Sequence, residues 1–366
     1  MKIFKYIFLL LLIVIIGGAV YIATLDGDYQ VEETKTLDAP ASLLFNEVNN
    51  YENWETWGPW KKEDPNMVIS YNEKTSGVGA GYSWQGDTAA DGEISTTEVI
   101  PNRRIHQEVI LKNPMGESKS DAYWIFEPIE NGKTKVVWGV KGDKTFWEKA
   151  YGLTKSETIT ETWKPFLTNG LIDIDQIVSK KMEAYDIHVD GITQYSGGFY
   201  MYRTTATKNN GKALSKRREE LLPSVTNFMS TNNINISGAP LMIYKEVDEQ
   251  NNTAIISSGV PTNSRVITPL DSDILCGFME SQMVLKTTLK GNHSNLIEAW
   301  AAANEYIRTH NIEKREDGEA FEIYINQPQD YPNPADWVTE VYIPIQQKSD
   351  DVDPESIIKE ENEIEI

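Results

Sequence analysis

The sequence predicts an α+β protein with two domains behind one membrane-spanning helix. A chain of 366 residues exceeds what a single hydrophobic core usually organises, and its 40% hydrophobic residues, with ten tryptophans, suffice for two cores. The pattern of apolar residues changes along the chain from uninterrupted to alternating to helical. The second half also contains an internal repeat. We therefore expect a membrane anchor at 1–26, one domain at 27–186, a second at 187–347 and a tail at 348–366.

The charge balance excludes one class of partner. Acidic residues outnumber basic residues 55 to 34, a formal net charge of −21. Nucleic-acid binding needs a basic surface to contact phosphates, so we expect no nucleic-acid partner. Cys276 is the only cysteine, which excludes an intrachain disulfide and is typical of a buried structural thiol. The four histidines match no metal-ligand spacing, so we expect neither a metal nor a cofactor.

The N-terminal stretch is apolar over the length of a bilayer. Lys2 and Lys5 precede an unbroken apolar run, Tyr6–Ala23, which is followed by Asp26. Eighteen residues at a rise of ~1.5 Å cross roughly the hydrocarbon core. A cleaved signal peptide is the alternative, but Val20–Leu25 lacks a small-x-small exit. The two lysines predict a single-pass protein with a cytoplasmic N-terminus and its domains outside the cytoplasm.

Residues 28–185 have the pattern of an antiparallel sheet with helices at both ends. Tyr29–Leu37 alternates as a strand, and Ala41–Val48 is typical of a short helix. Apolar residues at helical spacing between Trp163 and Tyr185 close the domain. This order predicts a helix-grip, which is a curved antiparallel sheet with a long C-terminal helix. Six further strands are predicted, separated by turn residues: Met67–Tyr71, Ala80–Gln85, Gly92–Ile100, Arg104–Lys112, Ser120–Glu127 and Thr134–Lys141.

Parts of this stretch resemble the START-like superfamily (SRPBCC, polyketide cyclase type). They are the Asp-Ala-Pro entry, the Trp54-x-x-Trp57 cluster followed by Pro59-Trp60, and Gly170-Leu171 on the last helix. The resemblance implies a hydrophobic cavity between the sheet and the long helix. A core position is the alternative for each tryptophan of the domain. The tryptophans expected to line the cavity are Trp54, Trp57, Trp84, Trp124 and Trp138.

Residues 187–345 contain the internal repeat. The segment Arg203–Asn210 is similar to Lys286–Asn292, and Gly238–Tyr244 is similar to Gly318–Tyr324. One helical segment lies between the members of each pair, about 212–231 and then about 294–309. Each half is therefore predicted to be strand, helix, strand, strand. Two such βαββ units are expected to pair about a pseudo-twofold axis, with the sheet on one side and the helices on the other.

The last strand of this domain places a carboxylate beside aromatic rings. From Val338 to Ile345 the residues alternate, with Glu340 and Tyr342 on one face and aliphatic residues on the other. A carboxylate among rings is costly unless it is paired, and such a site attracts a cation. The alternative is an exposed glutamate on the solvent side of an edge strand.

The same residues resemble the GyrI-like family of bacterial effector-binding domains. The family's ending of Glu, a hydrophobic residue, Tyr, a hydrophobic residue and Pro stands here as Glu340–Pro344. The resemblance covers about 187–345 and implies that Glu340 reaches into a ligand cleft. Glu322 shares a side of its strand with Tyr324 and is predicted as a second acid of the cleft. The full set of expected ligand-binding residues here is Tyr200, Tyr202, Glu322, Tyr324, Trp337, Glu340 and Tyr342.

These observations predict a membrane-anchored protein that binds hydrophobic or amphipathic small molecules, some of them cationic. No complete catalytic constellation is present, so we expect binding rather than catalysis and assign no catalytic residue. Two alternatives stay open, a hydrolase or cyclase-like enzyme acting on a small electrophile, and a scaffold whose cavities are filled. The tail at 348–366 is acidic and without aromatic residues, which predicts disorder.

Overall fold

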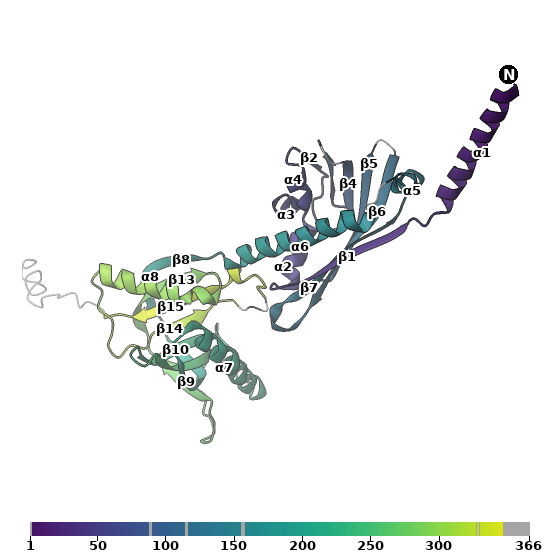
Figure 1. The fold of residues 1–366 in the computed structure, drawn as a ribbon. Helices are drawn as coiled ribbons and strands as arrows, with labels where there is room; N and C mark the ends of the chain where they lie inside the picture. The colour runs from purple at the N-terminus through teal and green to yellow at the C-terminus, as the bar shows by residue number, and fades with distance from the viewer. Residues whose placement is uncertain are drawn as a thin grey trace, which may run out of the picture. The chain divides into compact units, whose positions relative to one another are not determined.

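The computed structural model of the protein describes residues 2–87, 90–113, 116–154, 158–326, 328 and 330–346. Within it the chain forms two compact units, Met1–Lys181 and Met182–Ile366 (Figure 1). The expected α+β class, with two antiparallel sheets and an apolar N-terminal helix, is confirmed. The acidic tail predicted at 348–366 lies outside the described residues.

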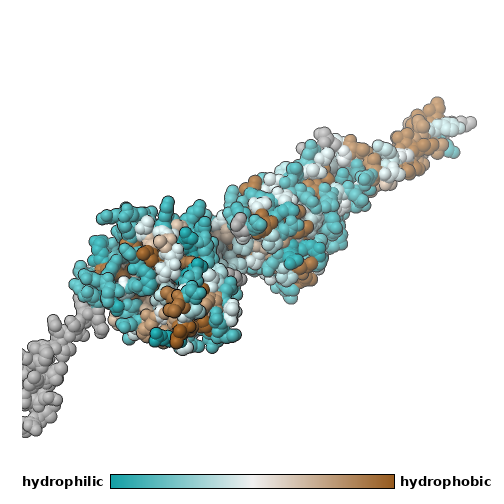
Figure 2. Space-filling view, turned by 90° about the horizontal axis from the view of Figure 1, so that it is seen from below, coloured by the Kyte–Doolittle hydropathy of each residue, from teal (hydrophilic) through white to brown (hydrophobic). Residues whose placement is uncertain are grey.

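The first element is an exposed apolar helix, α1 (Lys2–Thr24). Its segment Ile3–Thr24 is long and apolar enough to cross a membrane, and none of it is buried within the protein. The surface of α1 is mostly hydrophobic in Figure 2. An N-terminal signal sequence can also be long and apolar enough to meet this criterion, so the helix is compatible with either role.

The first unit is a seven-stranded antiparallel sheet with one long helix. Its strand order is β1-β7-β6-β5-β4-β3-β2, so the chain runs as a meander from β2 to β7 and β1 joins at the edge of β7. The strands are β1 (Asp28–Leu37), β2 (Val68–Tyr71), β3 (Gly81–Gln85), β4 (Asp91–Ile100), β5 (Arg104–Asn113), β6 (Gly116–Pro128) and β7 (Thr134–Asp143). The helices are α2 (Ala41–Asn49), η1 (Tyr51–Asn53), α3 (Trp54–Trp57), α4 (Pro59–Glu63), η2 (Glu130–Gly132), α5 (Phe146–Gly152) and α6 (Ile159–Glu183).

Helix α6 packs on this sheet through the predicted apolar stripe. Its buried residues recur three or four positions apart, as a helix facing a core requires. Gly170 brings the helix close to β7, because a Cβ atom at this position would meet the Trp138 ring at 2.3 Å. The expected helix-grip order of a sheet and a long closing helix is therefore present. The buried residues of α6 are Leu167, Gly170, Leu171, Ile174 and Val178.

The second unit is an eight-stranded antiparallel sheet with the order β12-β9-β11-β10-β14-β15-β13-β8. Its strands are β8 (Asp186–Tyr195), β9 (Gly198–Lys208), β10 (Leu241–Asp248), β11 (Thr253–Thr262), β12 (Leu275–Met279), β13 (Gln282–Lys290), β14 (Phe321–Tyr324) and β15 (Val338–Pro344). Its helices are α7 (Gly211–Thr231), η3 (His293–Asn295), α8 (Leu296–Thr309) and η4 (Pro334–Asp336).

The internal repeat has become a symmetric sheet. The repeats β9-α7-β10-β11 and β13-α8-β14-β15 meet where β10 pairs with β14, and Leu241 lies opposite Ile323. From this centre the strand order outward is the same in kind on both sides, with β12 and β8 added at the edges. The expected pair of βαββ units is confirmed.

Both helices of the second unit lie on one face of its sheet. Helix α7 packs on β9 and β11, where Val225 contacts a cluster that includes Met201. Helix α8 packs on β13, β8 and β15, where Ala303 contacts a cluster that includes Val341. The opposite face carries a separate cluster that contains Tyr200. Neighbours along a strand point to opposite faces, so Met201 and Tyr200 lie on different sides of β9.

Candidate functional site

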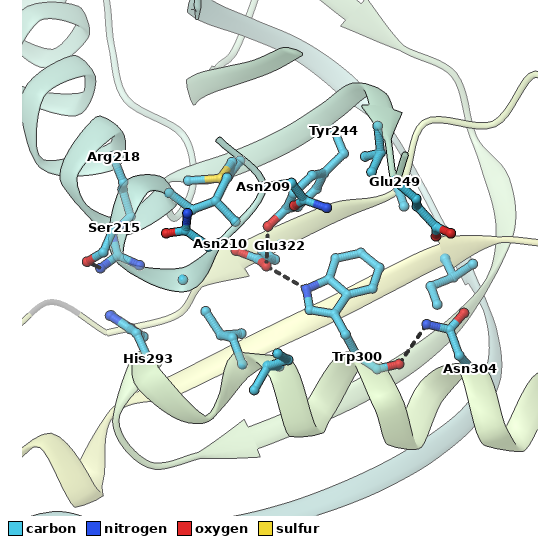
Figure 3. A pocket seen from close by; sticks show the side chains of 18 of the residues that line it. Asn209, Asn210, Ser215, Arg218, Tyr244, Glu249, His293, Trp300, Asn304 and Glu322 are labelled. Atoms are coloured by element: carbon cyan, nitrogen blue, oxygen red, sulfur yellow. Dashed lines mark hydrogen bonds between the residues drawn. The ribbon is translucent and has the colours of Figure 1, made fainter. Parts of the chain in front are cut away.

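A cleft of about 430 Å³ lies on the helical face of the second unit. Its walls come from α7, which supplies Ser215 and Arg218, and from α8, which supplies Trp300 and Asn304 (Figure 3). Its floor comes from the two central strands, β10 and β14. The cleft therefore lies where the two repeats meet.

The floor of the cleft carries a buried carboxylate. Glu322, in β14, is 2% exposed. Its Oε1 accepts hydrogen bonds from the Tyr244 hydroxyl at 2.8 Å and from the Trp300 indole N–H at 2.7 Å (Figure 3). Its Oε2 accepts one from the Tyr324 hydroxyl at 2.5 Å. These three donors offset much of the free-energy cost of burying the carboxylate. Since a carboxylate can accept about four hydrogen bonds, Glu322 can accept one more.

The tyrosines around Glu322 keep their protons. Burial, together with the Glu322 charge, raises the pKa of Tyr324 well above its ordinary value, and the same two causes raise the pKa of Tyr244. A phenol that holds its proton donates a hydrogen bond well but is a weak acid toward a substrate. The arrangement therefore suits binding better than proton transfer.

One end of the cleft combines a cation with a neutral imidazole. The Arg218 guanidinium lies 4.5 Å above the Tyr324 ring, and its Nη2 donates to the Ser215 hydroxyl at 3.2 Å. Burial, and then the nearby Arg218 charge, lower the pKa of His293 to about 3. Neither ring nitrogen of His293 has a hydrogen-bond partner among the residues that the structure describes. At neutral pH this histidine is therefore an uncharged group that can both donate and accept.

The structure brings only part of the predicted set into this cleft. Glu322 and Tyr324 line it, on the shared side that the alternation predicted. Trp337 lies behind it, with its ring 4.7 Å from the His293 ring and its indole N–H donating to the Tyr331 carbonyl at 2.6 Å. The cleft thus contains the second predicted acid and its tyrosine.

The remaining predicted residues lie on the other face of the sheet. Glu340 forms an ion pair of 2.6 Å with Lys286 and accepts a hydrogen bond from the Tyr342 hydroxyl at 2.7 Å. Tyr200, Tyr202 and Tyr342 belong to the cluster on that face. Glu340 is thus a paired carboxylate among aromatic rings, as the alternation suggested, but it does not line the cleft. Its role in ligand binding stays a prediction.

Several residues of the cleft were not predicted. Tyr244 occupies the position in the first repeat that Tyr324 occupies in the second, so the repeat itself could have identified it. Trp300 lies on α8 and Arg218 lies on α7. Their spacing is that of every other apolar or charged residue of an amphipathic helix, so the sequence pattern does not mark them as residues of a site. His293 lies in η3, the turn before α8. These three residues required the fold.

The first unit contains a second cavity, of about 340 Å³, beneath α6. Trp54, Trp84 and Trp138 line it, as predicted. Trp57 and Trp124 are completely buried behind it, and the Trp124 ring stacks on the Trp138 ring at 4.3 Å. These two residues support the wall and do not form its surface.

The wall of this second cavity is aromatic with few polar groups. Gln107 lines it, donates to the Tyr51 hydroxyl at 3.0 Å and accepts from the Trp124 indole at 3.2 Å. The indole N–H groups of Trp60 and Trp138 are buried and have no acceptor within the described part of the chain. Such a wall suits an apolar ligand that offers a hydrogen-bond acceptor.

Among the residues that the structure describes, we find no group of three or more histidine, cysteine or acidic residues that could hold a metal ion. This finding concerns the described residues alone.

Comparison with known proteins identifies part of the second unit. Residues 228–346 match the family model of the GyrI-like small molecule binding domain. The match does not extend to the first unit, so the START-like resemblance stays a prediction. No curated protein matches the sequence. Residues 228–346, within the second unit, are therefore similar to the GyrI-like small molecule binding domain.

Solved structures similar to this chain share little sequence with it. The EcmrR C-terminal domain is 11% identical, with 44% of this chain and 98% of that chain covered and a TM-score of 0.38. Protein CV1439 from Chromobacterium violaceum is 12% identical, with 40% and 95% covered and a TM-score of 0.31. EcmrR in a complex with DNA is 11% identical, with 60% and 88% covered and a TM-score of 0.38.

Proposed function

We propose that this protein is a membrane-anchored binding protein for hydrophobic or amphipathic small molecules. The cleft between α7 and α8 is the proposed principal site, and Glu322 is its polar anchor. The observation that carries the proposal is a buried carboxylate held by two phenols and an indole at the floor of an open cleft. A ligand with a cationic or donor group would complete the contacts of this carboxylate, while the rings contact its apolar body.

The surroundings of the two predicted acids favour Glu322 over Glu340. A cation that approaches Glu340 would compete with the Lys286 ammonium 2.6 Å away. The described residues offer Glu322 hydrogen-bond donors but no ion pair. Since a carboxylate already paired with a lysine attracts a further cation less strongly, the cleft is the stronger candidate.

Anchoring by α1 is the second part of the proposal. It is supported by the length and apolar composition of Ile3–Thr24 and by the finding that no residue of this segment is buried within the protein. The lysines before it support a cytoplasmic N-terminus, with both units on the other side of the membrane. The cavity of the first unit would then be a second site, for apolar ligands that carry an acceptor for the Trp138 indole.

A thermal-shift screen of the full chain in lipid nanodiscs tests the binding proposal. Aromatic quaternary ammonium ions are compared with their neutral isosteres, in which carbon replaces the nitrogen. We expect several cations to raise the unfolding temperature of the second unit more than their neutral isosteres do. No stabilisation by any compound of either kind would contradict the proposal.

Catalysis in the same cleft is the second candidate function. The hydrogen bond between Tyr324 and Glu322 at 2.5 Å joins a proton donor to a carboxylate that could serve as a base. A hydrolase of small electrophiles would use Glu322 to deprotonate water and a tyrosine to protonate the leaving atom. The raised pKa of both tyrosines opposes the second step, so binding is preferred. Hydrolysis of an aryl epoxide by the wild type, together with no hydrolysis by the Glu322→Gln variant, would favour the enzymatic function.

A further inference from the structure

Helix α5 and its C-terminal cap, Leu153, expose large apolar side chains. Phe146, Trp147, Tyr151 and Leu153 are each between 38% and 56% exposed, within eight consecutive residues. Isolated exposed apolar residues are common on protein surfaces, but a cluster of large ones marks an interaction surface.

This helix begins close to where the chain leaves α1. Three residues, Leu25–Gly27, separate the end of α1 from the start of β1. The Gly27 carbonyl accepts a hydrogen bond from the Lys144 amide at 3.0 Å, and Asp28 pairs with Asp143. Helix α5 starts two residues beyond Lys144. Since three extended residues span at most ~10 Å, a bilayer crossed by α1 lies within that distance of the segment that begins α5.

The chemistry of α5 fits the interfacial layer of a bilayer. Tryptophan and tyrosine are enriched at that level because their rings are apolar with one polar tip. The two charges of α5 are used within the protein, since Glu148 accepts from the Thr145 amide at 2.7 Å and Lys149 lies 3.8 Å from Asp143. The surface is therefore apolar and close to neutral. We therefore expect contact with lipid to come from insertion of the apolar side chains, and not from attraction of this surface to anionic headgroups.

We propose that α5 lies in the interfacial layer of the bilayer that α1 spans, with its exposed aromatic side chains inserted among the lipids. This inference rests on the membrane-spanning role of α1 in the proposed function. We assign lipid as the partner of this surface, because the short connection Leu25–Gly27 holds α5 beside the membrane whether or not another partner is present.

Docking of α5 would turn one end of the aromatic cavity toward the lipid. Leu111, on β5, lines that cavity and lies opposite Ser118 on β6. Two residues further along β6, Ser120 lies opposite Gly142, near the end of β7. Leu111 is thus near the end of the sheet at which β7 leads into α5. A ligand dissolved in the bilayer could then enter the cavity without crossing bulk water.

Site-directed fluorescence tests the inference on the full chain in phosphatidylcholine nanodiscs. In a Cys276→Ser background, single cysteines are introduced by Trp147→Cys, Ile129→Cys or Leu12→Cys and labelled with an environment-sensitive nitrobenzoxadiazole dye. Ile129 is a matched control, since it is 44% exposed and adjoins the end of β6 at the opposite end of the same sheet. Quenching by spin-labelled lipid and by aqueous iodide is measured for each label.

We expect the label at position 147 to be quenched by lipid at least threefold more than the label at position 129, and to be less accessible to iodide. Equal quenching of the two labels would overturn the inference. A label at 147 that is shielded from iodide but not quenched by lipid would mean that protein covers α5, which also overturns it. The label at position 12 separates the two proposals: if lipid does not quench it, the anchor itself fails.

Discussion

Glu322 and Glu340 are two carboxylates in neighbouring strands that face opposite sides of one sheet. In the pairing of β14 with β15, Ile323 lies opposite Glu340 and Val341 lies opposite Glu322. Paired residues point to the same face, so the two acids point to opposite faces. The alternation of each strand was readable in the sequence, but the register between the strands was not. For this reason the sequence could predict both acids as site residues but could not predict that they face opposite sides of the sheet.

The shifted pKa of His293 predicts a pH-dependent stability. Its folded-state pKa of about 3 lies below the ordinary value of 6.5, so the unfolded chain binds the proton first as the pH falls. The stabilisation is therefore complete above pH 6.5 and is lost progressively between pH 6.5 and pH 3. At pH 5 the loss due to this group should be about 2 kcal/mol.

Urea unfolding of the wild type and of the His293→Phe variant at pH 5 and pH 7.5 measures this effect. The wild type should lose more stability between the two pH values than the variant, because both share the titration of every other group. An equal loss in the two proteins would show that burial does not hold the imidazole neutral.

At the scale of elements, close approach of α6 to its sheet depends on one residue without a side chain. The apolar stripe of α6 was predicted from helical spacing, and so was its place at the end of the first domain. The close contact of Gly170 with the Trp138 ring could not be predicted, because it depends on where along β7 the helix crosses.

Substitution of this glycine tests the packing of α6. In Gly170→Ala the new methyl group would meet the Trp138 ring at 2.3 Å, so the helix or the ring must move. We expect the first unit to lose about 1–3 kcal/mol of stability, as overpacked cores do. The control is Gly152→Ala at the end of α5, where no atom lies within 4 Å and stability should change little. Equal unfolding midpoints for the two variants in urea would contradict the close packing.

At the scale of the whole molecule, the pair of βαββ units could be predicted from the sequence. The repeat between 203 and 324 indicated both βαββ units before any coordinates, because each repeated segment became the same element in both halves. The position of the cleft was not predictable, since it depends on which face of the sheet the two helices cover. The helices cover the face on which apolar residues such as Val225 and Ala303 find apolar partners in the sheet. The apolar character of these two helical residues does not indicate which face of the sheet that is.

The proposed anchor predicts how the whole chain behaves in cells. With α1 uncleaved, the protein should stay in membranes washed with alkaline carbonate, and mass spectrometry should find residues 2–24 in the mature chain. A chain that begins at Asp26 should be released into the soluble fraction with an unchanged circular dichroism spectrum in the far ultraviolet. Mature protein that lacks α1 would instead identify this helix as a signal peptide.

The binding of a cationic ligand at Glu322 is tested most directly by calorimetric titration with benzyltriethylammonium. The full chain in nanodiscs is compared with its Glu322→Gln and Glu340→Gln variants, and empty nanodiscs provide the reference for partition into lipid. We predict that Glu322→Gln weakens the Kd at least tenfold, about 1.4 kcal/mol, while Glu340→Gln changes it less than threefold. An unchanged Kd for Glu322→Gln, or a larger loss for Glu340→Gln, would contradict the placement of the binding site in this cleft.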